Sequence, residues 1–126
     1  MTTASTIYLI DDDLSVRRGL GRLLRAAGYN VVTCDTPEAF LALPSLTTPA
    51  CLLLDVRMPK MTGLELQSAL HDDGRDPPIV MLSGHVDATT TERALSAGAV
   101  AVLSKPVELN ALVHALERGL ARDRSH

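Results

Sequence analysis

The sequence lacks several features that would mark a specialised class of protein. Only two cysteines, Cys34 and Cys51, occur in 126 residues, so we expect small buried hydrophobic residues and no disulfide framework. No apolar run approaches the roughly 18–20 residues that a membrane span needs. Residues 1–6 are polar and unlike a signal peptide. These absences favour a reduced, cytoplasmic protein without a membrane segment.

Strong positive charge is also missing. The formal net charge is -3 at pH 7, whereas a nucleic-acid-binding surface normally carries clustered Lys and Arg. We interpret the two basic groups as solvated helix faces, and we expect no direct nucleic-acid contact from this domain. The groups are Arg17, Arg18, Arg22 and Arg25, and Arg118, Arg122 and Arg124.

The length fits one domain, and no linker, repeat or low-complexity segment divides the chain. We expect this domain to span residues 1–126, with a structured core over about residues 6–122. Residues 123–126 are interpreted as a frayed end or as a cut made in a longer chain. With 46% hydrophobic residues, such a chain can bury a single core.

Short apolar runs alternate with segments of helical periodicity. The runs predict strands at residues 7–10, 31–32, 51–54, 79–82 and 100–103, each followed by a helix. Thr36-Pro37 and Asp87 are typical helix starts, and Gly28 and Gly98 typical helix ends. The predicted inward stripes are Val16, Leu20, Leu23, Leu24 and Ala27 in the first helix, Leu66, Ala69 and Leu70 in the third, and Leu109, Leu112, Val113, Leu116 and Leu120 in the last.

Continuous apolar strands indicate a parallel sheet covered by helices on both faces. We therefore predict an α/β fold, a doubly wound five-stranded parallel sheet with five helices. Polar side chains follow four of the strands, and in such a fold they meet at one edge of the sheet. They are Asp11, Asp12 and Asp13 after the first strand, Asp55 at the end of the third, Ser83 after the fourth and Lys105 after the fifth.

Carboxylates gathered at one edge need a positive partner. Each pair would repel by roughly 4 kcal/mol at ~4 Å in an effective dielectric of ~20. A hard cation such as Mg²⁺ and the ammonium of Lys105 offset this repulsion. The arrangement suits phosphoryl transfer, in which a carboxylate attacks phosphorus while positive groups and the Ser83 hydroxyl bind the phosphoryl oxygens. Asp13 is interpreted as a helix N-terminal acid.

Together these motifs resemble the receiver domains of two-component response regulators over the whole chain. The residues that carry the resemblance are Asp11-Asp12, the run Leu53-Leu54-Asp55-Val56-Arg57-Met58-Pro59 with Gly63, Ser83-Gly84, and Lys105-Pro106. The resemblance implies the flavodoxin-like strand order 2-1-3-4-5.

By the same resemblance, Asp55 is the phosphoacceptor. Asp12 is the principal Mg²⁺ ligand, joined by Asp11, Asp55 and the backbone carbonyl of Arg57. Ser83 and Lys105 bind the phosphoryl group, and a cis bond between Lys105 and Pro106 aims the lysine into the site.

The resemblance also implies partners. A sensor histidine kinase donates the phosphoryl group, and the face formed by the fourth helix, fifth strand and fifth helix binds a second copy or an output domain. The segments Ser83-Gly84-His85 and Ala97-Gly98-Ala99 are most similar to the subgroup fused to helix-turn-helix output domains. Catalysis would be limited to self-phosphorylation and slow autodephosphorylation, so the domain is not expected to be an enzyme.

Two positions depart from the family pattern. Val102 stands where an aromatic switch residue is usual, and Val107 stands where Phe is common. The usual relay from the hydroxyl of Ser83 to an aromatic ring is therefore in question, although the phosphorylation chemistry is not.

Two hypotheses concern the loops. Arg57 and His85, each two residues past a site residue, stand at positions that in the family influence hydrolysis of the aspartyl phosphate. One hypothesis is that they overhang Asp55 and tune the lifetime of its phosphate by gating water, and the alternative is that they are two solvated loop side chains. Residues 84–91 are mobile without phosphate, because the run Thr89-Thr90-Thr91 is a middling helix former. The other histidines are not expected to be ligands.

Two competing interpretations remain. A phosphohydrolase with an aspartate nucleophile typically has an acid two residues later, where this chain has Arg57. A pseudo-receiver, an interaction module that is never phosphorylated, is compatible with Val102.

Overall fold

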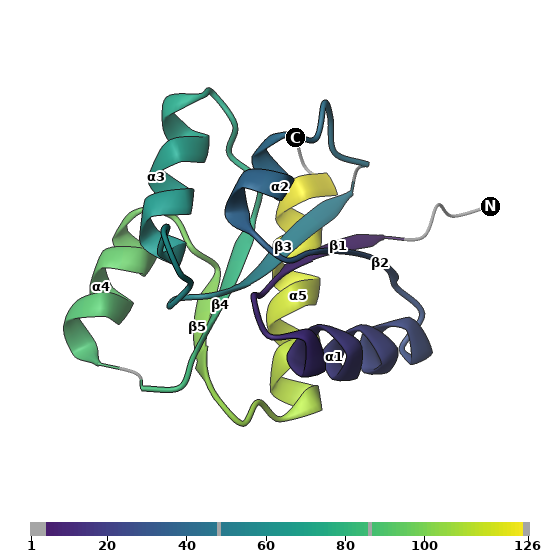
Figure 1. Cartoon of the computed structure of the whole chain (residues 1–126). Coiled ribbons are helices and arrows are strands. Elements are labelled where there is room, and N and C mark those ends of the chain that lie inside the picture. Colours follow the sequence, from purple (N-terminus) through teal and green to yellow (C-terminus); the bar gives the residue numbers. More distant parts are fainter. Residues whose placement is uncertain (1–4, 48, 86, 125–126) are drawn as a thin grey trace.

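A computed structural model of the chain describes residues 5–47, 49–85 and 87–124, in which five strands alternate with five helices (Figure 1). The strands are β1 (Thr6–Ile10), β2 (Asn30–Cys34), β3 (Ala50–Asp55), β4 (Ile79–Ser83) and β5 (Ala101–Ser104). The helices are α1 (Leu14–Ala26), α2 (Pro37–Leu41), α3 (Gly63–Asp72), α4 (Ala88–Ser96) and α5 (Leu109–Arg124). None of these helices is long and apolar enough to cross a membrane.

The strands form one parallel sheet in the order β2-β1-β3-β4-β5, which confirms the predicted fold and strand order. Alternate strand residues enter two hydrophobic cores, one on each face of the sheet. The first core includes Phe40 of α2, Leu66 of α3 and Ala94 of α4. The second includes Leu24 of α1 and Leu116 of α5. The sheet is therefore covered on both faces, as predicted.

The expectation of fully covered strands holds for the three central strands and is wrong for both edge strands, β2 and β5. Every residue of β1, β3 and β4 is buried, whereas most of β2 and all of β5 are exposed or half-buried. Because β2 and β5 are edge strands, each pairs with the sheet on one side only.

Side-chain caps fix the helix starts. Asp13 accepts from the backbone of Ser15 at 2.9 Å, and Asp87 accepts from Thr90 at 2.7 Å. Thr36 caps α2 as predicted, and Gly28 and Gly98 adopt φ of +101° and +104° just after α1 and α4. The sequence analysis missed the capping box of Thr62 and Glu65 at the start of α3.

The predicted inward stripes need three corrections. In α1, Leu23 is 48% exposed and Ala27 is exposed, while Gly21 is buried, so the buried face is rotated toward Gly21. In α3, Gln67 is buried more deeply than Ala69. In α5, Leu109 is 38% exposed because it lies in the first turn. Apolar periodicity identifies a helix but does not fix which flank faces the sheet.

The predicted frayed end is wrong for residues 123–124, which belong to α5. The carboxylate of Asp123 accepts from the backbone N–H of Ala50 at 2.7 Å, and Arg124 donates to the hydroxyl of Ser5 at 2.9 Å. Residues 125–126 lie outside the described residues. The last turn of α5 thus fastens the amino-terminal ends of β1 and β3.

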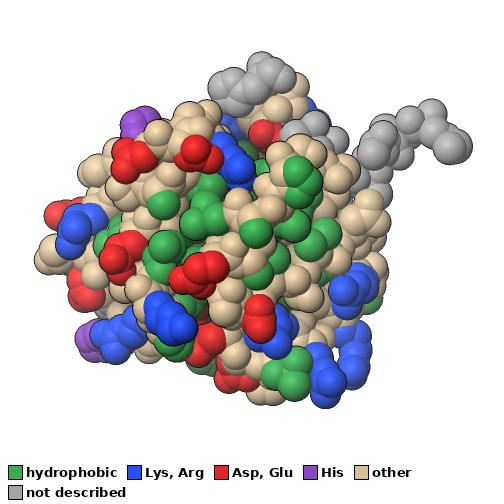
Figure 2. Space-filling model, turned by 45° about the horizontal axis from the view of Figure 1, so that its top comes forward, with side chains coloured by type: hydrophobic (Ala, Val, Ile, Leu, Met, Phe, Trp, Pro, Cys, Tyr) green, Lys and Arg blue, Asp and Glu red, His purple; other side chains and the backbone are tan. Residues whose placement is uncertain are grey.

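The basic groups are exposed for the most part. Arg18, Arg22 and Arg25 are exposed on α1, and Arg17 is half-buried. On the face drawn in Figure 2, Lys and Arg side chains are interspersed with acidic ones over most of the surface, and several gather together at its lower right. The face drawn therefore carries charges of both signs, in keeping with the predicted solvated surfaces.

Candidate functional site

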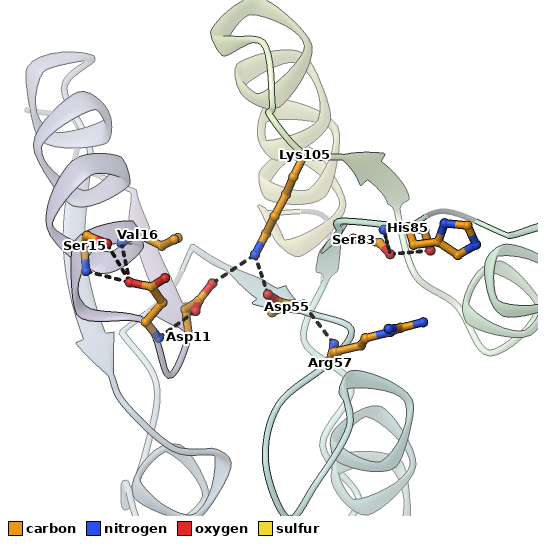
Figure 3. A network of polar contacts seen from close by, with 9 residues as sticks. Asp11, Ser15, Val16, Asp55, Arg57, Ser83, His85 and Lys105 are labelled. Atoms are coloured by element: carbon orange, nitrogen blue, oxygen red, sulfur yellow. Dashed lines mark hydrogen bonds and ion pairs between the residues drawn. The ribbon is translucent and has the colours of Figure 1, made fainter.

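Three charged side chains meet at the carboxyl-terminal edge of the sheet (Figure 3). Asp11 directly follows β1, Asp55 ends β3, and Lys105 directly follows β5. They come together because β1, β3 and β5 run parallel and end at the same edge. The structure therefore confirms that these three predicted residues share one site.

The ammonium of Lys105 lies between the two carboxylates. It donates a short hydrogen bond to Oδ2 of Asp55 and lies 3.7 Å from Oδ2 of Asp11. Burial alone would lower the pKa of Lys105, but the hydrogen bond to Asp55 and the attraction of both carboxylates raise it. Lys105 is therefore held in its charged form. The Lys105-Pro106 bond is cis, as predicted.

Asp11 is the most deeply buried of the three, with its side chain 2% exposed. Its Oδ1 accepts from the backbone N–H of Asp13 at 2.9 Å, while Oδ2 has no hydrogen-bond partner among the described residues. Desolvation is the main reason that the pKa of Asp11 is raised. A buried carboxylate oxygen without a donor is suited to binding a cation.

Asp13 has a separate, structural role. Its Oδ1 accepts from the Ser15 hydroxyl at 2.7 Å and from the backbone N–H groups of Ser15 and Val16. These hydrogen bonds lower the pKa of Asp13, and the one from the Ser15 hydroxyl has the largest effect. Its interpretation as a helix N-terminal acid is confirmed.

The predicted Mg²⁺ ligands are only partly assembled. Exposed Asp12 lines a separate pocket of about 120 Å³ together with Asp35, Glu38 and Lys60. Within the part of the chain that the structure describes, no group of three or more Asp, Glu, His or Cys side chains is arranged to hold a metal ion. The residues that fit a cation are Asp11, whose Oδ2 accepts no hydrogen bond among the described residues and faces only the Lys105 ammonium at 3.7 Å, and the adjacent Asp55.

Ser83 does not face the charged cluster. It is 3% exposed, and its hydroxyl donates to the carbonyl oxygen of His85 at 2.9 Å and accepts from the His85 N–H at 3.2 Å. Figure 3 shows this pair apart from Asp55 and Lys105. In this state the hydroxyl is engaged by its own loop, although the strand ends bring it to the same edge.

Arg57 contacts the site through its backbone, whose N–H donates to Oδ1 of Asp55 at 2.8 Å. Its side chain extends away from Asp55 in Figure 3, toward the side on which His85 lies. Both side chains help to lower the pKa of Asp87, after the larger effect of the hydrogen bonds from Thr90. The predicted overhang above Asp55 is therefore not the arrangement in this structure.

Val102 and Val107 fill hydrophobic positions. Val102 packs against the core on the α2, α3 and α4 face, and Val107 packs against the other core. Half-buried Val102 supplies a small side chain where an aromatic ring was expected. Of the segment predicted to be mobile, residue 86 lies outside the described residues, and Thr89, Thr90 and Thr91 are helical.

Sequence analysis missed two supports of the site. Nη1 of Arg17 donates to the carbonyl oxygen of Asp11 at 2.7 Å. A Cβ atom added to Gly63 would lie 2.7 Å from a Leu54 methyl and 3.0 Å from the Asp55 carbonyl oxygen, so the start of α3 packs directly on the end of β3. Gly63 belongs to the motif around Asp55 that carries the family resemblance. Only the fold shows that a larger residue would not fit at this position.

Comparisons with known proteins agree with this geometry. A sequence model of the response regulator receiver domain matches residues 7–117. The response regulator protein TodT of Pseudomonas putida is 38% identical over 117 residues, which cover 93% of this chain and 52% of TodT. The transcriptional regulatory protein FixJ of Bradyrhizobium diazoefficiens is 40% identical over 121 residues, covering 95% of this chain and 58% of FixJ.

Solved structures give the same result. The response regulator StyR superposes with a TM-score of 0.90 at 43% identity, covering 98% of this chain and 62% of StyR. This chain therefore spans between half and two thirds of the length of these three relatives.

Proposed function

This chain belongs to the response regulator receiver domains of two-component systems, and on that premise we propose that Asp55 accepts a phosphoryl group in a Mg²⁺-dependent reaction. The observation that carries the proposal is the position of the Lys105 ammonium between the carboxylates of Asp55 and Asp11. A cation held beside a nucleophilic carboxylate is what transfer of a charged phosphoryl group needs.

The chain supplies the nucleophile and part of the charge neutralisation. An oxygen of Asp55 attacks phosphorus, and the bond from phosphorus to the donor's leaving atom breaks, which gives an aspartyl phosphate. The backbone N–H of Arg57 orients the attacking carboxylate through Oδ1. Lys105 then pairs with a phosphoryl oxygen in place of the Asp55 oxygen that it binds in the resting state.

Asp11 and Asp55 are positioned to hold Mg²⁺, with Asp12 and the carbonyl of Arg57 as further ligands. When bound, the ion neutralises negative charge on the phosphoryl oxygens. Asp12 would have to turn toward Asp11 to join them, which its exposed side chain has room to do.

Phosphorylation would change the loop between β4 and α4. The phosphoryl group offers the Ser83 hydroxyl a charged acceptor in place of the His85 carbonyl. Loss of that bond would free His85, two residues before the Asp87 cap of α4. We propose that the resulting shift alters the face of α4, β5 and α5, with Val102 adjusting by repacking and not by rotation of a ring.

The partners follow from the same proposal. A sensor histidine kinase would supply the phosphoryl group, and the altered face would contact a second copy or a helix-turn-helix output domain elsewhere in a full-length protein. The proposed setting is the cytoplasm, and the domain's own chemistry is confined to gaining and slowly losing its phosphoryl group.

Labelling with a small phosphodonor tests the proposal. The chain is incubated with acetyl phosphate, with and without Mg²⁺, and intact-mass spectrometry followed by peptide mapping locates the added group. We expect one phosphoryl group on Asp55 only when Mg²⁺ is present, and none in the matched variant Asp55→Asn. Absence of labelling in the folded wild type would instead support the pseudo-receiver interpretation.

A further inference from the structure

Helix α4 is anchored shallowly to the rest of the molecule. Of its nine residues only Ala94 is buried. The helix lies beside α3 in Figure 1, and Gln67 of α3 helps to line a surface pocket of about 430 Å³ between the two. With so little apolar burial, the polar contact between α3 and α4 strongly influences how easily α4 can move.

Gln67 makes that contact, and it uses only one of its two amide atoms. It is 5% exposed, and its NH₂ group donates to the carbonyl oxygen of Ala94 at 3.1 Å. The same carbonyl oxygen also accepts from the backbone N–H of Ala99 at 2.9 Å, so it does not depend on Gln67 for a donor. The other amide atom of Gln67, Oε1, is buried and has no hydrogen-bond partner among the described residues.

The two atoms have opposite effects on stability. The net gain from a typical hydrogen bond is smaller than the cost of leaving a buried acceptor without a donor. An apolar side chain of similar length would give up the bond to Ala94, whose oxygen keeps Ala99, and would remove the unpaired Oε1. In the resting state Gln67 therefore makes the contact between α3 and α4 less stable than an apolar residue would.

A second unpaired polar atom lies on α4 itself. The Oγ1 atom of Thr91 is buried and has no hydrogen-bond partner among the described residues. Four such side-chain atoms occur in the described part of the chain, and those of Gln67 and Thr91 belong to α3 and α4. Because buried polar groups are normally paired, an unpaired one calls for an explanation, and stored strain is one of the few available.

We propose that Gln67 and Thr91 form a release device for α4, which lowers the stability of the resting position of this helix. Displacement of α4 breaks the bond from Gln67 to Ala94, but it lets water reach Oε1 of Gln67 and the hydroxyl of Thr91. The inference rests on the proposed function, in which phosphorylation of Asp55 shifts the face that contains α4. It adds that unpaired polar atoms at α3 and α4 reduce the free energy which that shift requires.

Amide hydrogen exchange of the unphosphorylated chain tests the resting contact. Gln67→Met keeps a similar length and removes the unpaired oxygen, so exchange at residues 88–97 is expected to slow roughly five- to tenfold. If the hydrogen bond of Gln67 simply held α4 in place, exchange would become faster instead. Thr91→Val, which replaces the hydroxyl by a methyl group, is expected to slow the same amides. Ser68→Ala, at an exposed site on α3, is the matched control with unchanged exchange.

Binding of beryllofluoride, which mimics a phosphoryl group on an aspartate, tests the link to the switch. In the presence of Mg²⁺, amide shifts of the ¹⁵N-labelled chain measure its affinity. Gln67→Met is expected to bind it roughly five- to tenfold more weakly than the wild type, because the ligand must displace a more stable resting state. Ser68→Ala should bind it with wild-type affinity.

The inference is overturned if exchange in Gln67→Met is unchanged or faster, or if this variant binds beryllofluoride as well as the wild type. A Gln67→Met chain that does not fold would also overturn it, since the replacement should stabilise the protein. Failure of the wild type to bind beryllofluoride would count against the proposed phosphorylation of Asp55. The exchange comparison would then still decide whether Gln67 weakens the resting contact.

Discussion

At the scale of single residues, Asp11 combines a role in the proposed chemistry with a cost in stability. Asp11 is buried beside Asp55, and the ammonium of Lys105 offsets their repulsion at a distance of 3.7 Å from Asp11. Burial of a partly compensated charge lowers the stability of the fold, yet the same charge is what a bound cation requires.

We predict that Asp11→Asn stabilises the protein by about 1 kcal/mol at neutral pH while slowing Mg²⁺-dependent labelling. The raised pKa means that folded Asp11 binds a proton at a higher pH than the unfolded chain, whose value is 3.8. Wild-type stability therefore recovers as the pH falls through the raised pKa, and the advantage of the variant shrinks toward pH 3.8. Urea unfolding across this range measures the difference, and an advantage that grows on acidification would contradict it.

Gly63→Ala is predicted to destabilise the protein by about 1–3 kcal/mol, because the new methyl group would overlap Leu54 and the backbone of Asp55. The matched control is Gly19→Ala in α1, where a Cβ meets no atom within 4 Å. That control should gain about 0.5–1 kcal/mol from helix propensity. Thermal unfolding of both variants checks the pair, and equal effects would remove the steric explanation.

At the scale of elements, helix starts were predicted better than helix faces. Thr36 and Asp87 act as caps as predicted, and Asp13, predicted as a helix N-terminal acid, is the cap of α1. Capping depends on residues close in sequence. The buried face of α1 was misplaced, because the sheet and Gly21 determine which flank packs. The sequence pattern also did not predict which way the Ser83 hydroxyl points. Its direction is determined by the turn in which it donates to the carbonyl oxygen of His85.

Asp87→Ala is predicted to destabilise the protein by about 0.5–2 kcal/mol and to speed amide exchange at residues 88–91. The reason is the loss of the hydrogen bonds from Thr90 to the Asp87 carboxylate. Hydrogen-exchange mass spectrometry measures it, with Asp87→Ser as the control that retains a capping oxygen. The same experiment tests the predicted mobility around α4, which strong wild-type protection would refute.

At the scale of the whole molecule, the fold, the strand order and the family followed from the sequence, because apolar runs and strand-end residues repeat a known arrangement. The meeting of Asp11, Asp55 and Lys105 was predicted from strand direction alone. The pocket lined by Gln67 was not predicted, because its two walls belong to α3 and α4 and only the packing of these helices brings them together. The tie between the end of α5 and β3 also escaped prediction, because it joins residues 73 positions apart.

Asp123→Ala is predicted to lower stability by about 1–2 kcal/mol, because the N–H of buried Ala50 loses its acceptor. The matched control is Glu92→Ala, an exposed carboxylate on α4, which should change stability by less than about 0.5 kcal/mol. Chemical denaturation compares the two. If Asp123→Ala unfolded at the same denaturant concentration as the wild type, water would have to replace the carboxylate as acceptor for the Ala50 N–H without loss of stability.

The shallow anchorage of α4 has an evolutionary consequence. Only Ala94 of its nine residues is buried, so substitutions elsewhere along this helix leave the hydrophobic core intact. The element that the proposed switch would present to other proteins is therefore one on which most substitutions cost the core little. Duplicated copies of such a domain could diverge in what they recognise while inheriting the same folding stability.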